Sequence, residues 1–358
     1  MVANTRKMYE LKLKIADILE YEDECLTLIE GLVEMQKLNL KRVEEIKQIQ
    51  NGRDILSEFI SPIDIEELFE NSYLKDIEVG NNKNEKLHLS NKRVIRPNYI
   101  VCTNTNYRDD DFMPVRKWGY FTQKVSLPSL CENDTNICWM TVEPYEINTF
   151  ASFASSAKGG ILLGGCGLGY IAYILSLKED VSKITIVEKD KQVIDLFESA
   201  ILPQFKYKEK VNIVEGDILE YLNVADLTQF DEINVDVWRD YIDMIYIYLP
   251  LLVIERKNPQ VNFSYWLEEN MRYHIGKSIL KAFAEKSDSK DIVDIIGKYI
   301  LDNAEVNNAM DLKNLIKLEN MRELLYTWYV DNVELTDKMK EETSRKLERF
   351  MKISKQLF

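Results

Sequence analysis

Four glycines fall within six positions of this sequence, in the stretch ILLGGCGLGY that covers residues 161–170. The chain has 358 residues and only 13 glycines, so this concentration is unusual. Apolar residues precede the glycines, as in a buried strand, and apolar residues follow them, as in a helix. A glycine turn between a strand and a helix presents backbone NH groups that no side chain shields. The stretch therefore predicts a ligand-binding turn at the carboxyl edge of a parallel sheet.

Acidic residues follow the next predicted strands. Glu188 ends ITIVE, at a position where an acid can bind both hydroxyls of a ribose. Asp217 follows VNIVE and precedes the apolar Ile218, where a carboxylate can accept a hydrogen bond from an adenine amino group. Asp236 follows FDEINV. Because the carboxyl ends of parallel strands meet at one edge, we expect these acids and the glycine turn to share one site.

Strand and helix patterns alternate between residues 159 and 266. Strands are predicted over 161–164, 184–188, 211–215, 230–238 and 261–266, and helices over 170–177 and 191–202. Such alternation predicts an α/β fold with a doubly wound, mainly parallel sheet. The stretch YIDMIYIYLPLLVI, which starts at residue 241, is predicted to be a buried helix, because it contains Asp243 and Pro250 and is too short to span a membrane.

The flanking segments have different patterns. We divide the chain into a helical N-terminal module (1–75), a small β-rich region (76–140), the α/β domain (141–266) and a helical C-terminal region (267–358). Ser61 and Pro62 are expected to start a helix. In the C-terminal region, helices are predicted over 268–283, 291–301, 312–329 and 335–357. The helical ends are candidates for a homodimer contact.

The composition argues against several functions. A net charge of -14 disfavours binding to a nucleic-acid backbone. Two distant histidines and five cysteines without a close pair predict no metal site, no histidine-dependent nucleophile and mostly reduced thiols. The acids at 109–111 are expected to form a solvated loop. The first residues contain no apolar export signal, so we expect a cytoplasmic protein without a membrane anchor.

The stretches ILLGGCGLGY, IVEKD, VEGDILEYL and FDEINVDVW resemble the class I S-adenosylmethionine-dependent methyltransferases, most closely their spermidine-synthase-like branch. The similarity covers about residues 139–266 and implies a Rossmann-like sheet. The sequence departs from this class after residue 266, where helical patterns replace the last strands of the usual sheet. The resemblance also implies S-adenosylmethionine, or alternatively its decarboxylated form, as the cofactor. The implied cofactor contacts are Gly165, Cys166, Gly167, Leu168 and Gly169 of the turn, then Glu188, Lys189, Asp217 and Ile218.

The stretch WMTVEPYEINTF lies where spermidine synthases carry a helix with the sequence Tyr-His-Glu. Glu146 matches the glutamate of that helix, and Tyr145 replaces the histidine. The resemblance therefore implies that both residues contact the ligand. A local explanation also stays open, in which Thr141 caps a helix that has Pro144 in its first turn.

Asp236 is the predicted catalytic residue, as the group that orients or deprotonates the acceptor, and Trp238 and Tyr145 are predicted walls around the sulfonium. A purely structural role, in which Asp236 caps the next helix and Trp238 packs, is the alternative. The aspartate pair that aminopropyl transfer requires is broken here, because Arg239 stands at the second position and Asp240 one residue later.

The resulting hypothesis is an S-adenosylmethionine-dependent methyltransferase whose acceptor is a small molecule or a protein. The first alternative is a spermidine-synthase-like aminopropyltransferase, for which the acidic composition is suitable. The second alternative is a catalytically inactive protein that binds the cofactor and serves in interactions.

Overall fold

The structure is a computed structural model, and it describes residues 6–20, 23, 60–95, 97, 99–106, 112–135, 137–238, 241–285 and 291–357. The predicted loop at 109–111, and the Arg239 and Asp240 positions of the broken aspartate pair, lie outside these residues. Residues 6–20 form a helix. Its buried Ile15 and Leu19 belong to the same apolar core as the C-terminal helices.

The centre of the fold is a five-stranded sheet in which all neighbouring strands run parallel. Its strands are β7 (Gly159–Gly164), β8 (Val181–Glu188), β9 (Val211–Glu215), β10 (Glu232–Val235) and β11 (Asn262–Tyr265). Their order is β11-β10-β7-β8-β9. The chain adds β8 and β9 on one side of β7, then crosses back and adds β10 and β11 on the other side, so the switch point of the sheet lies between β7 and β10. This arrangement confirms the predicted α/β fold with a doubly wound, Rossmann-like sheet.

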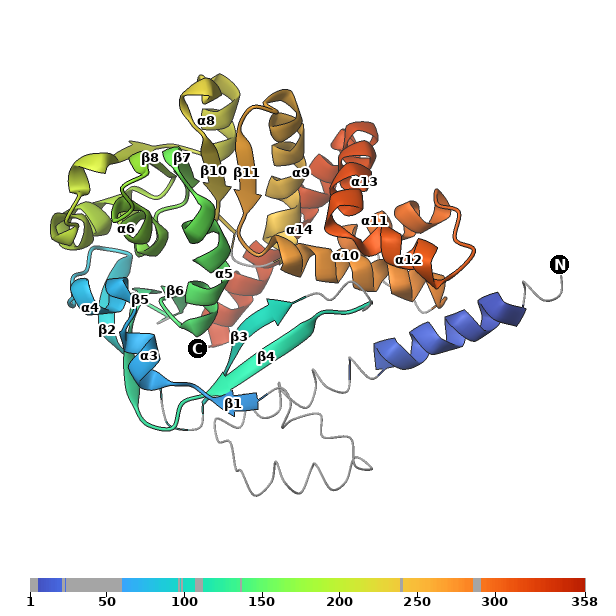
Figure 1. Ribbon diagram of the computed structural model, residues 1–358, viewed down its shortest axis with the longest axis horizontal. Helices are drawn as coiled ribbons and strands as arrows, with labels where there is room; N and C mark the ends of the chain where they lie inside the picture. Colours follow the sequence, from blue (N-terminus) through green and yellow to red (C-terminus); the bar gives the residue numbers. More distant parts are fainter. Residues whose placement is uncertain are drawn as a thin grey trace.

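Helices cover both faces of this sheet (Figure 1). One face packs on α5 (Pro144–Ser156), α6 (Tyr170–Ser176) and α7 (Lys191–Leu196), and the other on α8 (Ile218–Val224) and α9 (Tyr241–Lys257). Successive side chains of β7 alternate between the faces: Ile161 and Leu163 join the first core, and Leu162 joins the second. Because both faces are buried at the centre of the sheet, the central strand β7 contains only apolar residues and glycines.

Short irregular helices complete the connections between these elements. They are η1 (Phe197–Ile201), η2 (Leu202–Gln204), η3 (Lys208–Lys210) and η4 (Leu227–Gln229). The helix predicted over 191–202 is therefore α7 followed by a π-helical turn and a 3-10 turn.

Two smaller sheets precede the central sheet. The first has the order β1-β4-β3 and the second β2-β5-β6. Their strands are β1 (Ile60–Pro62), β2 (Leu87–Ile95), β3 (Ile100–Asn106), β4 (Val115–Tyr120), β5 (Val125–Glu132) and β6 (Cys138–Thr141).

The expected helix start at Ser61 and Pro62 is wrong, because both residues pair with β4 as part of β1. Helix α3 (Ile65–Phe69) starts later, where the Asp64 side chain accepts a hydrogen bond from the Glu67 NH at 3.0 Å. A second short helix, α4 (Ser72–Asp76), follows.

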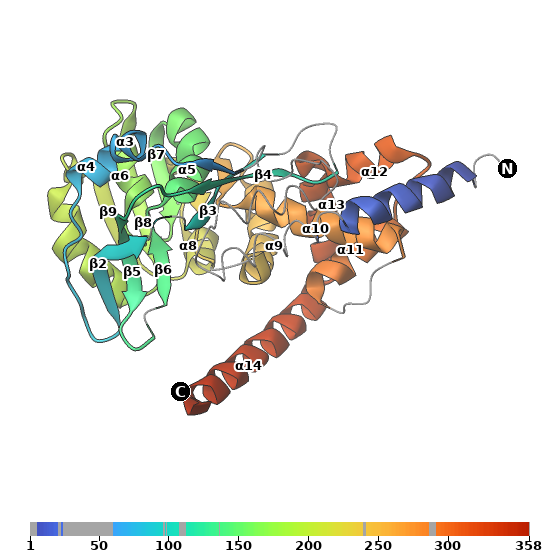
Figure 2. The same cartoon turned by 90° about the horizontal axis from the view of Figure 1, so that it is seen from below.

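Five helices follow β11. They are α10 (Glu268–Phe283), α11 (Ile292–Asp302), α12 (Ala309–Ile316), α13 (Leu318–Asp331) and α14 (Val333–Leu357). The single helix predicted over 312–329 is in fact α12 and α13, because Lys317 adopts an extended conformation between them. Figure 2 shows that α14 extends away from the body of the molecule. Among the described residues, none of the helices has the length and apolar character needed to cross a bilayer.

A buried ion-pair network joins these helices to the sheet. Arg322 of α13 donates two hydrogen bonds of 2.6 Å to the Glu268 carboxylate of α10, and a third of 3.1 Å to Glu255 of α9. Tyr265 of β11 donates to Glu255 at 2.9 Å, and Tyr248 of α9 donates to Glu268. One apolar core also extends from β10 and β11 into α10–α13. The C-terminal helices and the sheet are therefore packed as one body.

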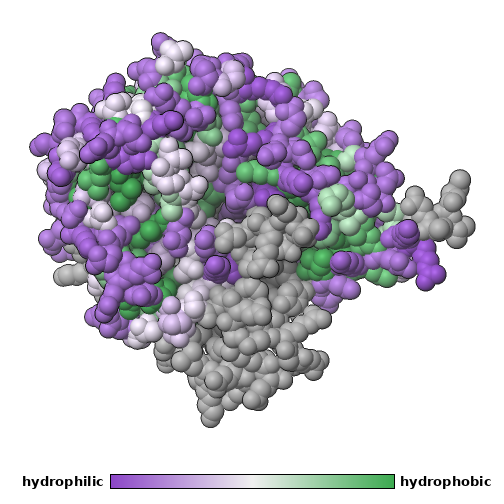
Figure 3. Space-filling view, in the orientation of Figure 1, coloured by the Kyte–Doolittle hydropathy of each residue, from purple (hydrophilic) through white to green (hydrophobic). Residues whose placement is uncertain are grey.

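The face of the molecule seen in Figure 3 is mainly hydrophilic, and its apolar patches are small and separate. Large apolar side chains that are exposed in the described part of the chain are scattered, as in Tyr9, Ile137, Val224 and Met310. Such isolated exposed side chains are common on proteins and indicate no particular binding surface.

Replacement of Arg322 by methionine is expected to lower the free energy of unfolding by about 2–4 kcal/mol, because the buried Glu268 carboxylate loses its cationic partner and keeps only the hydrogen bond from Tyr248. Arg345→Met is the matched control, since Arg345 forms an exposed pair with Glu341 and its loss should cost less than about 0.5 kcal/mol. Denaturant unfolding followed by circular dichroism measures both values. Equal values for the two variants would contradict the role given to the network.

Candidate functional site

A cavity of about 870 Å³ lies at the carboxyl ends of β7, β8, β9 and β10. Strand β6 and the helices α5, α9 and α14 supply further parts of its wall. Eleven of the residues predicted from the sequence line it: Tyr145, Glu146, Gly165, Cys166, Gly167, Glu188, Lys189, Asp217, Ile218, Asp236 and Trp238. Residues that are distant in the sequence therefore meet at the switch point of the sheet, where open α/β sheets bind ligands.

The glycine turn brings β7 close to β10. Gly165 has a φ of 95°, and a Cβ atom there would lie 2.1 Å from the Asp236 carbonyl oxygen. Gly164 is similarly confined, because its Cβ would lie 2.9 Å from Ile218. The absence of a side chain at Gly165 thus allows the backbone of Asp236 to approach the turn directly.

Leu168 and Gly169, which were predicted to contact the cofactor, do not line the cavity. Leu168 is fully buried, and its carbonyl accepts a 2.6 Å hydrogen bond from the Tyr73 hydroxyl. Gly169 caps α6 in the left-handed conformation, and a Cβ there would lie 2.2 Å from the Phe197 ring. These two positions are explained by packing, since they lie on the protein side of the turn.

Met140 of β6 lies against the turn. The Leu168 NH donates to the Met140 Sδ at 3.2 Å, and a Cβ at Gly167 would come within 2.5 Å of that sulfur. Met140 lines the cavity but was not predicted from the sequence. A methionine in a short strand gives no local sign of this role, which depends on how β6 pairs with β5.

Glu188 is fixed to the glycine turn. Its Oε2 accepts a hydrogen bond from the Cys166 NH at 2.9 Å, and its Oε1 accepts one from the Asp190 NH at 2.8 Å. Each carboxylate oxygen has two acceptor positions, so both retain capacity for ligand hydroxyls. The tether thus holds a carboxylate in a defined orientation at the cavity wall.

Asp217 has several partners within the protein. It caps α8 by accepting hydrogen bonds from the Leu219 and Glu220 NH groups at 2.9 and 3.4 Å, and Lys189 donates to it at 3.0 Å. Burial disfavours its charge, but Lys189 and the backbone NH groups outweigh burial, and together they lower the pKa of Asp217. Next to it, Gly216 faces open space, with no atom within 4 Å of an added Cβ.

Glu146 lies in the first turn of helix α5 and lines the cavity. Only 6% of this side chain is exposed, and its Oε1 has no hydrogen-bond partner. Burial, together with the charges of Asp236 and Glu143, raises the pKa of Glu146 well above its ordinary value.

The start of helix α5 differs in part from the prediction. Pro144 is at the helix start as predicted. The expected cap by Thr141 is wrong, because Thr141 belongs to β6, and Glu143 precedes the helix without a side-chain cap bond.

Asp236 forms the floor of the cavity. Its backbone NH donates to the Gly164 carbonyl at 2.8 Å, which continues the pairing of β10 with β7 past the strand end. The residue is half-buried, and its exposed surface faces the cavity. Removal from bulk water, with a contribution from the Glu188 charge, raises the pKa of Asp236 to about 8. At neutral pH its carboxyl group is therefore a much stronger base than an exposed aspartate.

Two buried polar atoms in this cavity have no partner in the described part of the chain. They are the Glu146 Oε1, an acceptor when ionised, and the Trp238 Nε1, a donor. Buried polar atoms normally form hydrogen bonds, and exceptions are frequent at functional sites. The cavity wall is also rich in acidic side chains, which are Glu143, Glu146, Glu188, Asp236 and Asp243. The site is thus suited to a ligand that is cationic and that also carries hydrogen-bonding groups.

Further lining residues come from α9 and α14 and were missed from the sequence. They are Asp243, Tyr246 and Ile247 of α9, and Lys340, Thr343 and Ser344 of α14. The Tyr246 hydroxyl and the Thr343 Oγ1 lie 3.2 Å apart, which docks α14 on α9. The sequence offered one sign of this, the position of Asp243 seven residues after Asp236, which places a second acid near the end of β10. Nothing in the sequence places α14 at the site, because that contact is purely tertiary.

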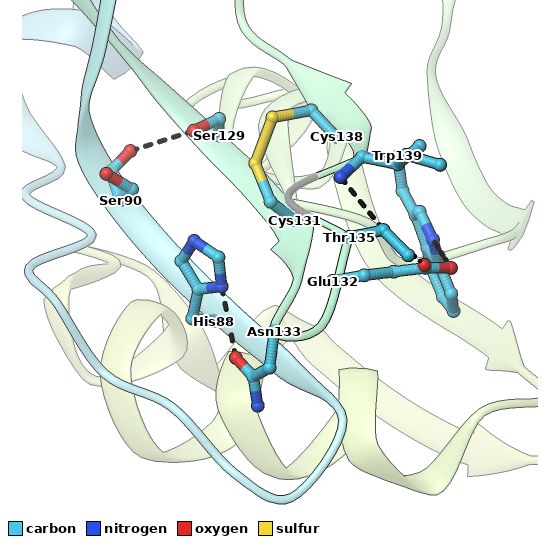
Figure 4. The surroundings of a disulfide bond; sticks show 10 residues. His88, Ser90, Ser129, Cys131, Glu132, Asn133, Thr135, Cys138 and Trp139 are labelled. Atoms are coloured by element: carbon cyan, nitrogen blue, oxygen red, sulfur yellow. Dashed lines mark hydrogen bonds between the residues drawn. A yellow bond between two sulfur atoms is a disulfide. The ribbon is translucent and has the colours of Figure 1, made fainter. Parts of the chain in front are cut away.

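The structure contains a disulfide bond between Cys131 and Cys138, so the expectation of reduced thiols is wrong for this pair. The two residues face each other across the hairpin of β5 and β6 (Figure 4), a relation that their spacing alone did not reveal. Cys102 and Cys166 are free. Among the described residues, no group of three or more His, Cys, Asp and Glu side chains is arranged to hold a metal ion.

No protein-family model and no curated protein matches this chain. The solved structures that are similar to it include two spermidine synthases. One is a spermidine synthase in complex with the transition-state analogue AdoDATO, with 15% sequence identity, a TM-score of 0.31, and coverage of 58% of this chain and 71% of that chain. The other is the spermidine synthase from Thermotoga maritima, with 14% identity, a TM-score of 0.30, and coverage of 62% and 74%. The fold and the cavity themselves define the class: this is a Rossmann-like α/β protein with an acidic cavity at the switch point of its sheet.

Gly165→Ala is expected to destabilise the protein by about 2–4 kcal/mol, because a Cβ would clash with the Asp236 carbonyl in a backbone conformation that alanine rarely adopts. Gly216→Ala is the matched control at another strand end of the same cavity, where no atom obstructs a methyl group. Thermal and denaturant unfolding measure the difference. A Gly165→Ala variant as stable as Gly216→Ala would show that β7 and β10 do not need this close approach.

The raised pKa of Asp236 should make the free energy of unfolding depend on pH. The folded state holds its proton up to a pH of about 8, whereas the unfolded state releases it near the ordinary value of 3.8, so stability falls as pH rises between these values. Asp236→Asn should remove this loss and be more stable than the wild type by about 1–3 kcal/mol at pH 9, with a smaller difference at pH 5. Unfolding curves at several pH values test this, with the exposed Glu179→Gln as control. A difference that does not change with pH would contradict the raised pKa.

Proposed function

We propose that this protein is a transferase that binds S-adenosylmethionine and moves its methyl group to a small-molecule or protein acceptor. The observation that supports this most directly is the meeting, in one cavity, of the glycine turn, its tethered Glu188 and the half-buried Asp236. The cofactor supplies an activated methyl group on a cationic sulfur. The protein then has to orient the acceptor, exclude water and accept a proton.

The lining residues are suited to each part of this cofactor. Glu188 retains acceptor capacity for ribose hydroxyls, and the open space at Gly216 beside Asp217 and Ile218 suits an adenine ring. Tyr145 and Trp238 offer aromatic surface to the sulfonium, whose charge is also favoured by the surrounding acids. The unpartnered Trp238 Nε1 and Glu146 Oε1 are available to the ligand.

Asp236 is the proposed base. With its pKa raised to about 8, the Asp236 carboxyl group is mostly protonated near neutral pH when the cavity holds no cation. The positive charge of a bound sulfonium would favour the carboxylate, which can then take a proton from an amine or hydroxyl acceptor. Burial and the charge of Asp236 make Glu146 harder to ionise. A proton accepted by one carboxyl group would relieve the repulsion between them.

Aminopropyl transfer from decarboxylated S-adenosylmethionine is the second candidate. The observation that favours it is the number of acids inside the cavity, since Glu143 and Asp243 accompany Glu146 and Asp236. Such a cluster suits a diamine acceptor and disfavours the cofactor carboxylate. A protein that binds the nucleoside without turnover is the non-enzymatic alternative.

Calorimetric titration with S-adenosylmethionine and with its decarboxylated form tests the proposal. Glu188→Gln should weaken binding of the preferred nucleoside at least about tenfold, because a tethered acceptor for ribose hydroxyls is lost. The exposed Glu179→Gln should bind like the wild type. Circular dichroism controls for correct folding of both variants.

The product then separates the reactions. After incubation with cell extract, S-adenosylhomocysteine indicates methyl transfer, and methylthioadenosine indicates aminopropyl transfer. Asp236→Asn should reduce turnover by about two to four orders of magnitude while nucleoside binding persists, as expected for loss of a general base. If neither nucleoside binds the wild-type protein, both transferase candidates are wrong.

A further inference from the structure

The disulfide bond lies at the wall of the ligand cavity. Cys131 of β5 and Cys138 of β6 are directly paired across the hairpin, and Cys138 lines the cavity. Cys131 is 4% exposed, whereas Cys138 is more accessible. A reactant that comes from the solvent or the cavity therefore meets the Cys138 sulfur first.

The residues beside the disulfide form a cluster at the rim of the cavity, which we call the rim cluster (Lys86, Glu132 and Trp139). The Trp139 Nε1 donates to the Glu132 carboxylate at 2.9 Å (Figure 4), and the Lys86 Nζ lies 4.6 Å from the centre of the Trp139 ring. All three residues line the cavity. Glu132 directly follows one cysteine and Trp139 directly follows the other, so the disulfide fixes how these two side chains meet.

The same strand carries the contact with the glycine turn. Met140, two residues after Cys138, accepts the hydrogen bond from the Leu168 NH through its sulfur. Movement of β6 relative to β5 would therefore alter the Trp139–Glu132 hydrogen bond of the rim cluster and the contact of Met140 with the glycine turn. At this end of the hairpin, the Glu132 NH also donates to the Ile137 carbonyl at 2.9 Å, and the disulfide is the covalent reinforcement of that pairing.

We propose that the Cys131–Cys138 pair is a thiol–disulfide exchange site that switches the ligand cavity between a fixed and a loosened form. One thiolate of a dithiol reductant attacks the Cys138 Sγ, and Cys131 leaves as a thiolate that takes up a proton. The second thiol of the reductant then attacks the reductant's own sulfur in the mixed disulfide. Cys138 is released and protonated, and the reductant ends as a disulfide. In the reduced form, β6 near Trp139 and Met140 is held only by non-covalent bonds.

Hydrogen exchange of the full-length protein, measured by mass spectrometry with and without dithiothreitol, tests the switch. We expect peptides that contain residues 138–141 and the amide of Leu168 to exchange at least about tenfold faster after reduction. Peptides from β7, which lies in the buried core, should not change. Removal of the reductant and reoxidation should restore slow exchange.

Cysteine variants provide matched controls. Cys131→Ser/Cys138→Ser should show fast exchange at residues 138–141 under both conditions, whereas Cys102→Ser, which removes a free thiol in β3, should respond like the wild type. Thiol titration of the denatured protein should find two fewer thiols in the oxidised form.

Identical exchange at residues 138–141 and 168 in the oxidised and reduced wild type would overturn the proposal, as would equal thiol counts. The wild-type comparison decides the question even if the double variant fails to fold. The measurement needs no ligand, so its failure is distinct from failure of the proposed transfer reaction.

Discussion

The architecture of the site depends on how closely two strand ends approach each other. Gly165 at the end of β7 lies so near the carbonyl of Asp236 at the end of β10 that no side chain fits between them. Backbone hydrogen bonds continue past both strands, from the Asp236 NH to Gly164 and from the Gly165 NH to Val187. This contact brings an acid to the glycine turn. It also fixes the gap at the switch point, around which the other lining residues are arranged.

The cavity concentrates negative charge in a place where water is scarce, which opposes folding. The pKa values of Asp236 and Glu146 are raised for this reason, and Glu146 and Trp238 each keep a polar atom without a partner. The stability that offsets these costs comes from other parts of the molecule. Both faces of the sheet are buried under helices, and the Arg322 network holds the C-terminal helices to β11 and α9. A poorly satisfied site within a well-packed frame is the usual arrangement in proteins that bind ligands.

Local patterns predicted the central part of the fold well. The strands at 161–164 and 184–188 are largely apolar because both of their sides are buried, whereas the edge strand at 211–215 is only partly buried. Glycines and acids mark their carboxyl ends. The features that the sequence did not reveal are those created by strand pairing and helix docking. Pairing with β4 makes Ser61 and Pro62 a strand, the β5–β6 hairpin brings Cys131 to Cys138, and docking on α9 places α14 at the cavity. Leu168 and Gly169 lie on the core side of the turn because of backbone geometry, which composition does not show.

The cavity walls are distributed widely along the chain, from Lys86 before the sheet to Ser344 in α14. During synthesis, the glycine turn and all five sheet strands leave the ribosome before the part of α14 that lines the cavity. The sheet can therefore form while the cavity still lacks one side, and the complete pocket is a late product of folding that depends on contacts of long sequence separation. Ligand binding in a growing chain would consequently report that the C-terminal helices have docked.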